Sequence, residues 1–153
     1  MSNDWKTIYI LCEGQTEESF CKELLKEHFV HYQINIIPHL LETSSGHKGG
    51  LPVYSKVKKQ IKSHKMEGEF YVTTFFDYYG LKKFPGINDL SEFANSLDKC
   101  EFLEEELSRD IDRRNFIPHI ILHEFEALLY SDLDSFENYF SQDELQNLKT
   151  DVQ

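Results

Sequence analysis

The sequence predicts an α/β fold: a mostly parallel, four-stranded sheet with helices on both faces. Two observations lead to this prediction. First, short runs of β-branched and aromatic residues alternate along the chain with longer stretches in which apolar residues recur at helical spacing. Such alternation favours right-handed crossovers between parallel strands, with helices packed above and below the sheet. Second, a chain of 153 residues, of which 40% are hydrophobic, can form one core, so we expect a single domain spanning residues 1–153.

The first predicted strand covers Lys6–Cys12, a run of β-branched and aromatic residues that stops at Glu13 and Gly14. Thr16 follows as a predicted N-cap, and apolar residues at helical spacing then continue to Phe29. The chain is therefore expected to begin with a strand, a turn and a helix.

The second predicted strand covers Ile34–Leu41. Pro38 lies inside it, and because proline cannot donate a backbone hydrogen bond, we expect this strand at an edge of the sheet or at a bulge. A loop rich in glycine and serine, Thr43–Gly50, comes next. Apolar residues at helical spacing from Val53 to Ile61 then predict the second helix.

The third predicted strand, Glu69–Tyr79, is long and apolar, as is typical of a buried strand. The segment Leu81–Leu90 contains proline and glycine and predicts a loop. Ser91 is the predicted N-cap of a helix that extends to Leu107. The fourth predicted strand covers Phe116–His123, and the chain after it is expected to be helical.

Composition and charge narrow the classes of function. Sixteen basic and twenty-seven acidic side chains give a net charge of -11, which on average repels a phosphate backbone, so nucleic-acid binding requires local cations. The three cysteines have no CxxC spacing, which disfavours a zinc ribbon or a disulfide framework and favours a reducing compartment. The N-terminal apolar run is too short for a signal peptide or a membrane span. We therefore expect a soluble, cytoplasmic protein without a membrane partner.

Acidic residues follow three of the predicted strands, at the edge where the carboxyl ends of the strands meet. Glu13 follows the first strand, Asp77 lies near the end of the third, Glu124 and Glu126 follow the fourth, and Glu17 begins the first helix. Functional crevices of open parallel sheets lie beyond this edge. Gathered carboxylates repel one another unless a cation neutralises them, and hard oxygen ligands suit Mg²⁺ or Mn²⁺. The sequence therefore predicts a divalent metal site made of these five acids.

A structural role is the alternative for each acid taken alone, because acids that follow strands often cap helices. This alternative applies to Glu13 and Glu17, which flank the start of the first helix. It is weaker for Asp77, which follows the run VTTFF, where a carboxylate is disfavoured unless it has a partner.

Two stretches carry cations that could bind phosphate. Lys48 lies in the glycine-rich loop, and Lys56, Lys59 and Lys62 lie on the second predicted helix. We predict these four lysines as nucleic-acid-binding residues. The alternative for the lysines of the helix is a solvated charged face without a ligand.

Three motifs along the chain are EGQTE (Glu13–Glu17), TTFFDYYGLKKFPG (Thr73–Gly86) and HEFEALLYSD (His123–Asp132). Together they resemble the TOPRIM-like domains and, more narrowly, a bacterial family of small TOPRIM-like proteins. The resemblance implies a Rossmann-like fold in which a glutamate after the first strand and aspartates after the third bind Mg²⁺ for phosphodiester cleavage. Glu13 and Asp77 match the first acid and the first aspartate of that pattern.

The sequence departs from the family at the second aspartate, where Tyr79 stands. Glu124 or Glu126 would then supply the missing carboxylate, so that Glu124 joins Glu13 and Asp77 as an expected catalytic residue. The resemblance also implies an ABC- or AAA-type ATPase partner in antiviral defence, and with it a homo- or hetero-oligomer. Members of the narrower family continue with a basic stretch, so the chain is expected to be truncated at its C-terminus.

The residues and the resemblance leave two functions open. The first is a Mg²⁺- or Mn²⁺-dependent nuclease subunit that cleaves DNA or RNA. The second is a catalytically degenerate TOPRIM-like adaptor or regulator of an ATPase, because Tyr79 replaces an expected ligand. Metal binding and nucleic-acid cleavage distinguish the two.

Overall fold

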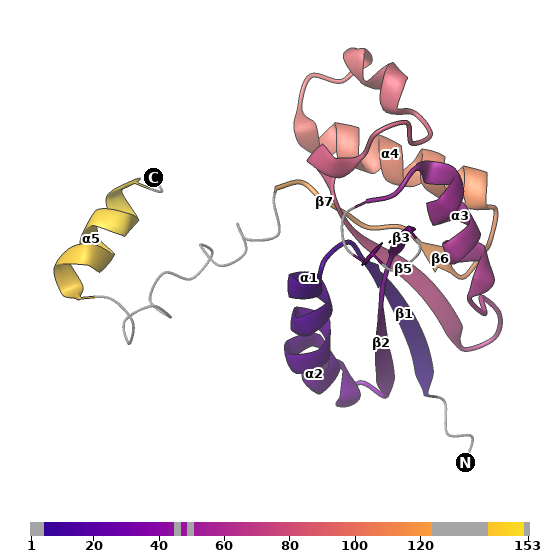
Figure 1. Ribbon diagram of the computed structural model, residues 1–153, viewed down its shortest axis with the longest axis horizontal. Helices are drawn as coiled ribbons and strands as arrows, with labels where there is room; N and C mark the ends of the chain where they lie inside the picture. Colours follow the sequence, from indigo (N-terminus) through magenta and orange to yellow (C-terminus); the bar gives the residue numbers. More distant parts are fainter. Residues whose placement is uncertain (1–4, 45–46, 49–50, 124–140, 152–153) are drawn as a thin grey trace. The chain divides into compact units, whose positions relative to one another are not determined.

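The structure of the protein is a computed structural model that describes residues 5–44, 47–48, 51–123 and 141–151 (Figure 1). The chain divides into two compact units, Met1–Leu122 and His123–Gln153. The second unit contains the helix α5 (Gln142–Asp151), and the other described elements belong to the first. A single domain over residues 1–153 stays a prediction. None of the described helices is both long and apolar enough to cross a membrane.

A parallel sheet organises the first unit. In spatial order its strands are β2 (Ile34–Leu40), β1 (Lys6–Cys12), β5 (Phe70–Asp77) and, both beside β5, β6 (Phe116–Ile117) and β7 (Ile120–Ile121). All the pairings described in this sheet are parallel, which confirms the predicted α/β fold with a mostly parallel sheet. The fourth predicted strand is divided into β6 and β7, and Pro118, which has no N–H to donate, lies between them.

The connections between the strands place helices on both faces of the sheet. The chain runs from β1 to β2 through α1 (Gln15–Phe20), the π-helical segment η1 (Cys21–Leu25) and α2 (Lys26–Val30). It then crosses to β5 through α3 (Tyr54–Ser63) and reaches β6 through α4 (Ser96–Ile111). Figure 1 shows α1 and α2 on one side of the sheet and α3 and α4 on the other, as the sequence predicts. A separate two-stranded antiparallel ribbon consists of β3 (Glu42–Ser44) and β4 (His47–Lys48).

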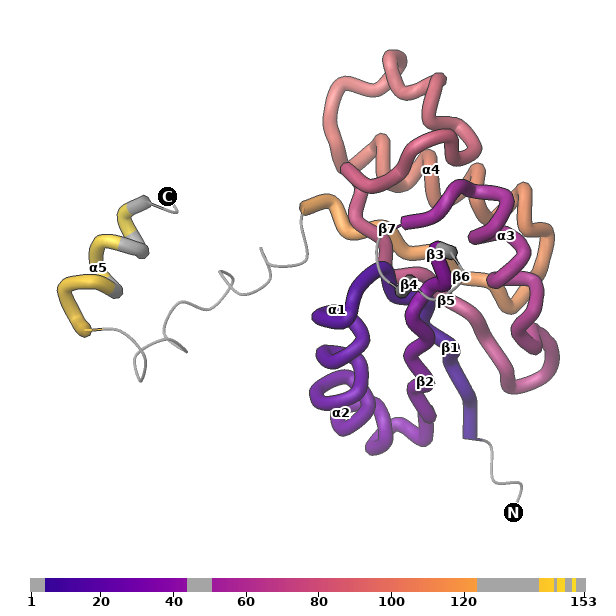
Figure 2. The backbone as a smooth tube through the Cα atoms, viewed as in Figure 1, coloured from indigo at the N-terminus to yellow at the C-terminus, as the bar shows by residue number. Residues whose placement is uncertain are grey.

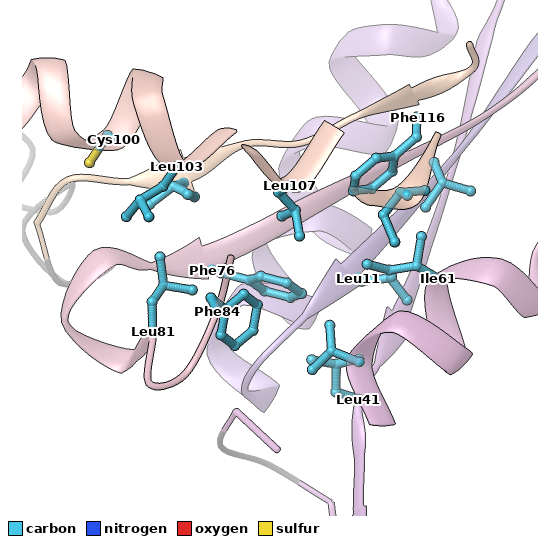
Figure 3. Packing of buried hydrophobic residues seen from close by; sticks show 14 residues of the cluster. Leu11, Leu41, Ile61, Phe76, Leu81, Phe84, Cys100, Leu103, Leu107 and Phe116 are labelled. Atoms are coloured by element: carbon cyan, nitrogen blue, oxygen red, sulfur yellow. The ribbon is translucent and has the colours of Figure 1, made fainter. Parts of the chain in front are cut away.

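Two clusters of buried side chains hold these layers together. The cluster under α1 and η1 consists of Ile10, Cys12, Cys21 and Ile36. The larger cluster joins the other face of the sheet to α3 and α4 (Figure 3) and includes Leu11, Val57, Ile61, Val72, Phe76, Leu103, Leu107 and Ile111. Successive residues of β1 alternate between the two clusters because side chains of a strand alternate between its faces. Each fully buried aliphatic or aromatic side chain stabilises the fold by about 1.5–3 kcal/mol.

The structure tests two predictions about the strands: the edge position of the strand with Pro38, and the length of the third strand. Pro38 lies in β2, which is an edge strand, as predicted. The third strand is shorter than predicted, because the chain leaves the sheet after Asp77 and forms the 3-10 turn η2 (Tyr78–Gly80). A second 3-10 segment, η3 (Ile87–Glu92), follows within the loop before α4. The residues directly after β5 therefore belong to a turn at the carboxyl edge of the sheet.

Both predicted helix caps are wrong. The first helix begins after Gly14, two residues before the position that Thr16 was expected to cap. The helix α4 is capped by Asn95, whose side chain accepts a hydrogen bond of 2.8 Å from the backbone N of Asp98, whereas Ser91 lies in η3. Asparagine and serine cap helices about equally well, so the sequence preference alone does not choose between them.

A polar contact joins α3 to α4 in addition to the core. Asp110 on α4 accepts a hydrogen bond from the hydroxyl group of Tyr54 and forms an ion pair with Lys58, both on α3. The distance between Nζ of Lys58 and Oδ2 of Asp110 is 2.8 Å. The contact with Lys58, followed by that with Tyr54, holds the pKa of Asp110 below its ordinary value.

This lowered pKa makes the contribution of Asp110 to stability dependent on pH. The contribution is present above the ordinary aspartate pKa of about 3.9 and is lost as the pH falls through the lower pKa of the folded state. We therefore expect Asp110→Asn to reduce the free energy of unfolding near neutral pH by an amount that shrinks towards zero in acid. Urea unfolding of both proteins across this pH range measures the difference. Asp89→Asn, an exposed carboxylate outside the contact, is the control for loss of one charge, and a difference that stays constant with pH contradicts the prediction.

Candidate functional site

The strand order reverses between β1 and β5. The chain leaves β1 through α1 on one face of the sheet and leaves β5 towards α4 on the other. In open α/β sheets, ligands bind in the crevice beyond the carboxyl ends of two such strands. Glu13 directly follows β1, and Asp77 is the last residue of β5. Two of the predicted acids therefore lie at the position where this fold binds ligands.

The structure brings Glu13 and Asp77 together. Oε1 of Glu13 accepts a hydrogen bond of 3.0 Å from the backbone N of Asp77. The same carboxylate lies against Gly80, where an added Cβ atom would be 3.2 Å from Oε1 and 3.3 Å from Oε2. Glu13 follows β1, but its carboxylate group is therefore held by the end of β5 and the turn after it. This bond to the neighbouring strand is not a helix cap.

Glu17 is buried at the start of α1. Its side chain is 8% exposed, and it folds back over Gly14, where an added Cβ atom would lie 2.6 Å from Oε2. This close approach explains why a residue without a side chain occupies the N-cap position. Oε2 of Glu17 is buried and has no hydrogen-bond partner among the described residues. Because an unpartnered buried carboxylate oxygen is unfavourable, this atom is suited to accept a water molecule or a cation.

The remaining two predicted acids cannot be placed. Glu124 and Glu126 lie outside the described residues. Within residues 5–44, 47–48, 51–123 and 141–151, no group of three or more His, Cys, Asp or Glu side chains is arranged to hold a metal ion. Glu13, Asp77 and Glu17 at this edge therefore form at most part of a ligand set, and the metal site stays a prediction.

A pocket of about 440 Å³ lies beside Glu13. The turn after β5 and the segment before α3 form its walls, which consist of Glu13, Leu51, Pro52, Val53, Tyr79, Gly80, Lys82 and Lys83. Figure 2 shows how the chain leaves β5 and loops away from the sheet before it returns as α4. The sequence pattern predicts this loop only as a connection, and its two lysines are not among the predicted phosphate-binding residues. Their position just after DYYG, next to a predicted ligand, was the signal that could have identified them.

The lysines predicted to bind nucleic acid lie elsewhere. Lys56, Lys59 and Lys62 are exposed on α3, and none of them lines the pocket. Nζ of Lys56 donates a hydrogen bond of 3.1 Å to the carbonyl oxygen of Thr43. Lys48 lies in the short strand β4. The three lysines of α3 form a solvated helix face, and their binding to nucleic acid stays a prediction.

Comparison with known proteins identifies the family of the chain. The chain belongs to the family of the domain of unknown function DUF4276, whose model matches residues 12–153. No curated protein and no solved structure matches it. The matched range includes Glu13, Asp77 and the pocket beside them, so the candidate site lies within the part of the chain that defines the family.

Proposed function

We propose that this member of the DUF4276 family is a nuclease subunit that uses Mg²⁺ or Mn²⁺ to cleave phosphodiester bonds of nucleic acid. The observation that carries the proposal is the carboxylate of Glu13, held against Asp77 where the strand order reverses. Lys82 and Lys83 line a pocket at the same place. Carboxylates that bind a metal and cations that bind a phosphate are the groups that phosphodiester hydrolysis requires.

The residues present fit a hard divalent cation. Glu17 offers a buried carboxylate oxygen without a hydrogen-bond partner among the described residues, and Glu13 and Asp77 offer further carboxylates at the same edge. These three acids would form part of the ligand set of the ion, because Mg²⁺ and Mn²⁺ prefer carboxylate oxygens. When bound, such an ion polarises a phosphoryl oxygen and lowers the pKa of an attacking water.

The protein's own groups position the acids and the phosphate. The backbone N–H of Asp77 orients the Glu13 carboxylate, and Gly80 leaves space for both of its oxygens. Lys82 and Lys83 supply positive charge beside the acids, which a protein with a net charge of -11 needs in order to admit a phosphate group. The site therefore combines a fixed carboxylate with a cationic wall.

Metal binding tests this proposal directly. We expect Mn²⁺ to raise the free energy of unfolding by about 2.7 kcal/mol at a free concentration of 100 times the Kd. Glu17→Gln should lose this gain, because it removes the charge of the buried carboxylate. Glu23→Gln, which changes an exposed acid of the following turn, should retain it. Thermal unfolding with Mn²⁺ and with EDTA measures the shift, and a wild-type protein that Mn²⁺ does not stabilise would overturn the proposed metal site.

Gly80→Ala is expected to impair catalysis without destabilising the fold. The new Cβ atom would lie 3.2–3.3 Å from the Glu13 carboxylate, which must then move by a few tenths of an ångström. Since a displacement of 1 Å can reduce a rate by about 100-fold, we expect metal-dependent cleavage to slow by roughly 10-fold. Gly68→Ala is the control. Gly68 has a φ of 58° at the opposite end of β5, so this variant should lose stability but keep its cleavage rate. Equal rates for Gly80→Ala and wild type would contradict the prediction.

Two observations favour the alternative, a degenerate adaptor or regulator of a partner ATPase. Tyr79 stands at the second aspartate position, and among the residues that the structure describes no three potential ligands are arranged around a metal. Under this alternative, Mn²⁺ does not stabilise the protein, and the complex with an ATPase survives substitution of both Glu13 and Asp77. Co-purification of the doubly substituted protein with its partner separates the two functions.

A further inference from the structure

We propose that the pocket beside Glu13 binds single-stranded nucleic acid, with Tyr79 stacking on one unpaired base and Lys82 and Lys83 contacting the adjacent phosphates. This inference rests on the proposed function, under which nucleic acid is the substrate. In addition, Tyr79, which stands where the resembled motif has its second aspartate, would bind a base, and the substrate would be single-stranded.

Tyr79 has the position and exposure of a stacking platform. It is 61% exposed and follows Asp77 by two residues, in the turn η2. Its ring meets the ring of Tyr78 edge-on, with centroids 5.3 Å apart and an interplanar angle of 73°. Tyr78 in turn packs against the larger core cluster. An exposed aromatic residue is unremarkable by itself, but this ring is supported from the core and lines a pocket beside a candidate metal ligand.

The two lysines next to Tyr79 are available for an anion. Lys82 and Lys83 are exposed, and neither forms an ion pair with a carboxylate in the described part of the chain. By contrast, Lys22, Lys58 and Lys65 are each paired with an acid. The pocket therefore presents two lysines outside any such ion pair beside one carboxylate, that of Glu13.

Lys83 also has an unfavourable backbone conformation. Its φ is 58°, in the left-handed region, which costs an L-residue roughly 1–2 kcal/mol and which glycine adopts freely. Strained residues of this kind are concentrated at functional sites. Glycine would be less strained than lysine at position 83. The presence of Lys83 there is therefore consistent with a requirement for its ammonium group.

The shape and chemistry of the pocket favour an unpaired strand over a duplex. Its volume of about 440 Å³ matches a small ligand such as a single nucleotide. The remaining wall, Leu51, Pro52 and Val53, is apolar and suits the face of a base. In a duplex the base faces are covered by their neighbours, whereas an unpaired base can stack on an aromatic ring. With a net charge of -11, the protein has little general attraction for a long phosphate backbone, so recognition of one exposed nucleotide fits better.

Binding without cleavage tests the inference. Glu13→Gln protein in EDTA is titrated into labelled single strands of about 12 nucleotides, as DNA and as RNA, and into the corresponding duplexes, with fluorescence anisotropy as the readout. We expect tighter binding to a single strand than to its duplex. Adding Tyr79→Ala should weaken it by about 5- to 150-fold, because stacking on one base contributes about 1–3 kcal/mol, whereas Tyr79→Phe should retain most of the affinity.

Two lysine variants separate a phosphate contact from a structural effect. Lys83→Gly removes the ammonium group and relieves the backbone, so it should keep or raise the unfolding temperature while it weakens binding. It should also reduce the slope of log affinity against log salt by about 0.7. Lys26→Ala, at an exposed position of α2 and outside the pocket, is the matched control and should change neither property.

The outcomes keep this inference distinct from the proposed function. Equal affinity for a single strand and its duplex, or unchanged binding by Tyr79→Ala, overturns the stacking site even if the wild-type protein cuts nucleic acid. Preferential single-strand binding by a protein that never cuts with Mg²⁺ or Mn²⁺ overturns the nuclease and leaves the binding site in place.

Discussion

We expect Glu13→Gln and Asp77→Asn each to abolish the proposed metal-dependent cutting of nucleic acid by the purified protein, assayed alone and with the proposed ATPase partner. Both substitutions keep the size of the side chain and remove its negative charge. The amide oxygen of Gln at position 13 can still accept the hydrogen bond from the backbone N of Asp77, so the local fold should persist. Since loss of even an outer partner of a metal ligand reduces activity by about 10- to 100-fold, we expect a decrease of more than about 100-fold for a ligand itself.

The rate of product formation with Mg²⁺ and with Mn²⁺, compared at equal concentrations of folded protein, measures this loss. Glu23→Gln serves again as the matched control, because it removes one negative charge from an exposed position in η1, the segment that follows α1. Cutting at the wild-type rate by both Glu13→Gln and Asp77→Asn would refute the nuclease. Loss of cutting by the control as well would indicate a general effect of charge and not of a ligand.

Phe84→Ala is expected to lower the free energy of unfolding by about 3–5 kcal/mol. Phe84 is buried in the larger core cluster. Its ring contacts the rings of Tyr54 and Phe76, with centroid distances of 4.9 and 6.3 Å. The residue also anchors the loop that carries Tyr79 and Lys82, so its removal both opens a cavity and releases one wall of the pocket. Urea unfolding measures the first effect, and single-strand binding under native conditions measures the second.

Phe84→Leu is the matched variant for this prediction. It keeps an apolar side chain in the cavity and should lose less stability than the alanine variant. A loss of less than about 1 kcal/mol in Phe84→Ala would show that the loop is not anchored through this ring. If Phe84→Ala loses much stability but the folded variant binds single strands unchanged, Phe84 stabilises the core without positioning the wall of the pocket.

The sequence was sufficient to predict the sheet and the position of two acids. Runs of β-branched residues identified β1, β2 and β5, and alternation with helices indicated that they are parallel. Because parallel strands align their carboxyl ends, the residues after β1 and at the end of β5 had to lie at one edge. The contact between Glu13 and Asp77 follows from that topology.

The caps and the pocket could not be predicted from local preferences. Gly14 is the N-cap of α1 because the Glu17 side chain lies over it and leaves no room for a Cβ atom. Residue preferences at the N-cap position do not take such a contact with a neighbouring side chain into account. Lys82 and Lys83 reach the pocket through the η2 turn and the left-handed backbone of Lys83. Both depend on backbone dihedral angles in a loop, and a pattern of apolar and polar residues carries no information about them.

The sheet and the loop after β5 contribute different groups to the candidate site. Glu13 and Asp77 are fixed by the hydrogen-bonded scaffold, whereas Tyr79, Lys82 and Lys83 extend from a surface connection that is anchored at Phe84. Surface connections tolerate exchange far better than the strands that bear them. Under the proposed function, replacing the segment from Tyr79 to Lys83 would therefore change which strand the pocket accepts, while Glu13 and Asp77, the proposed metal ligands, would keep their geometry.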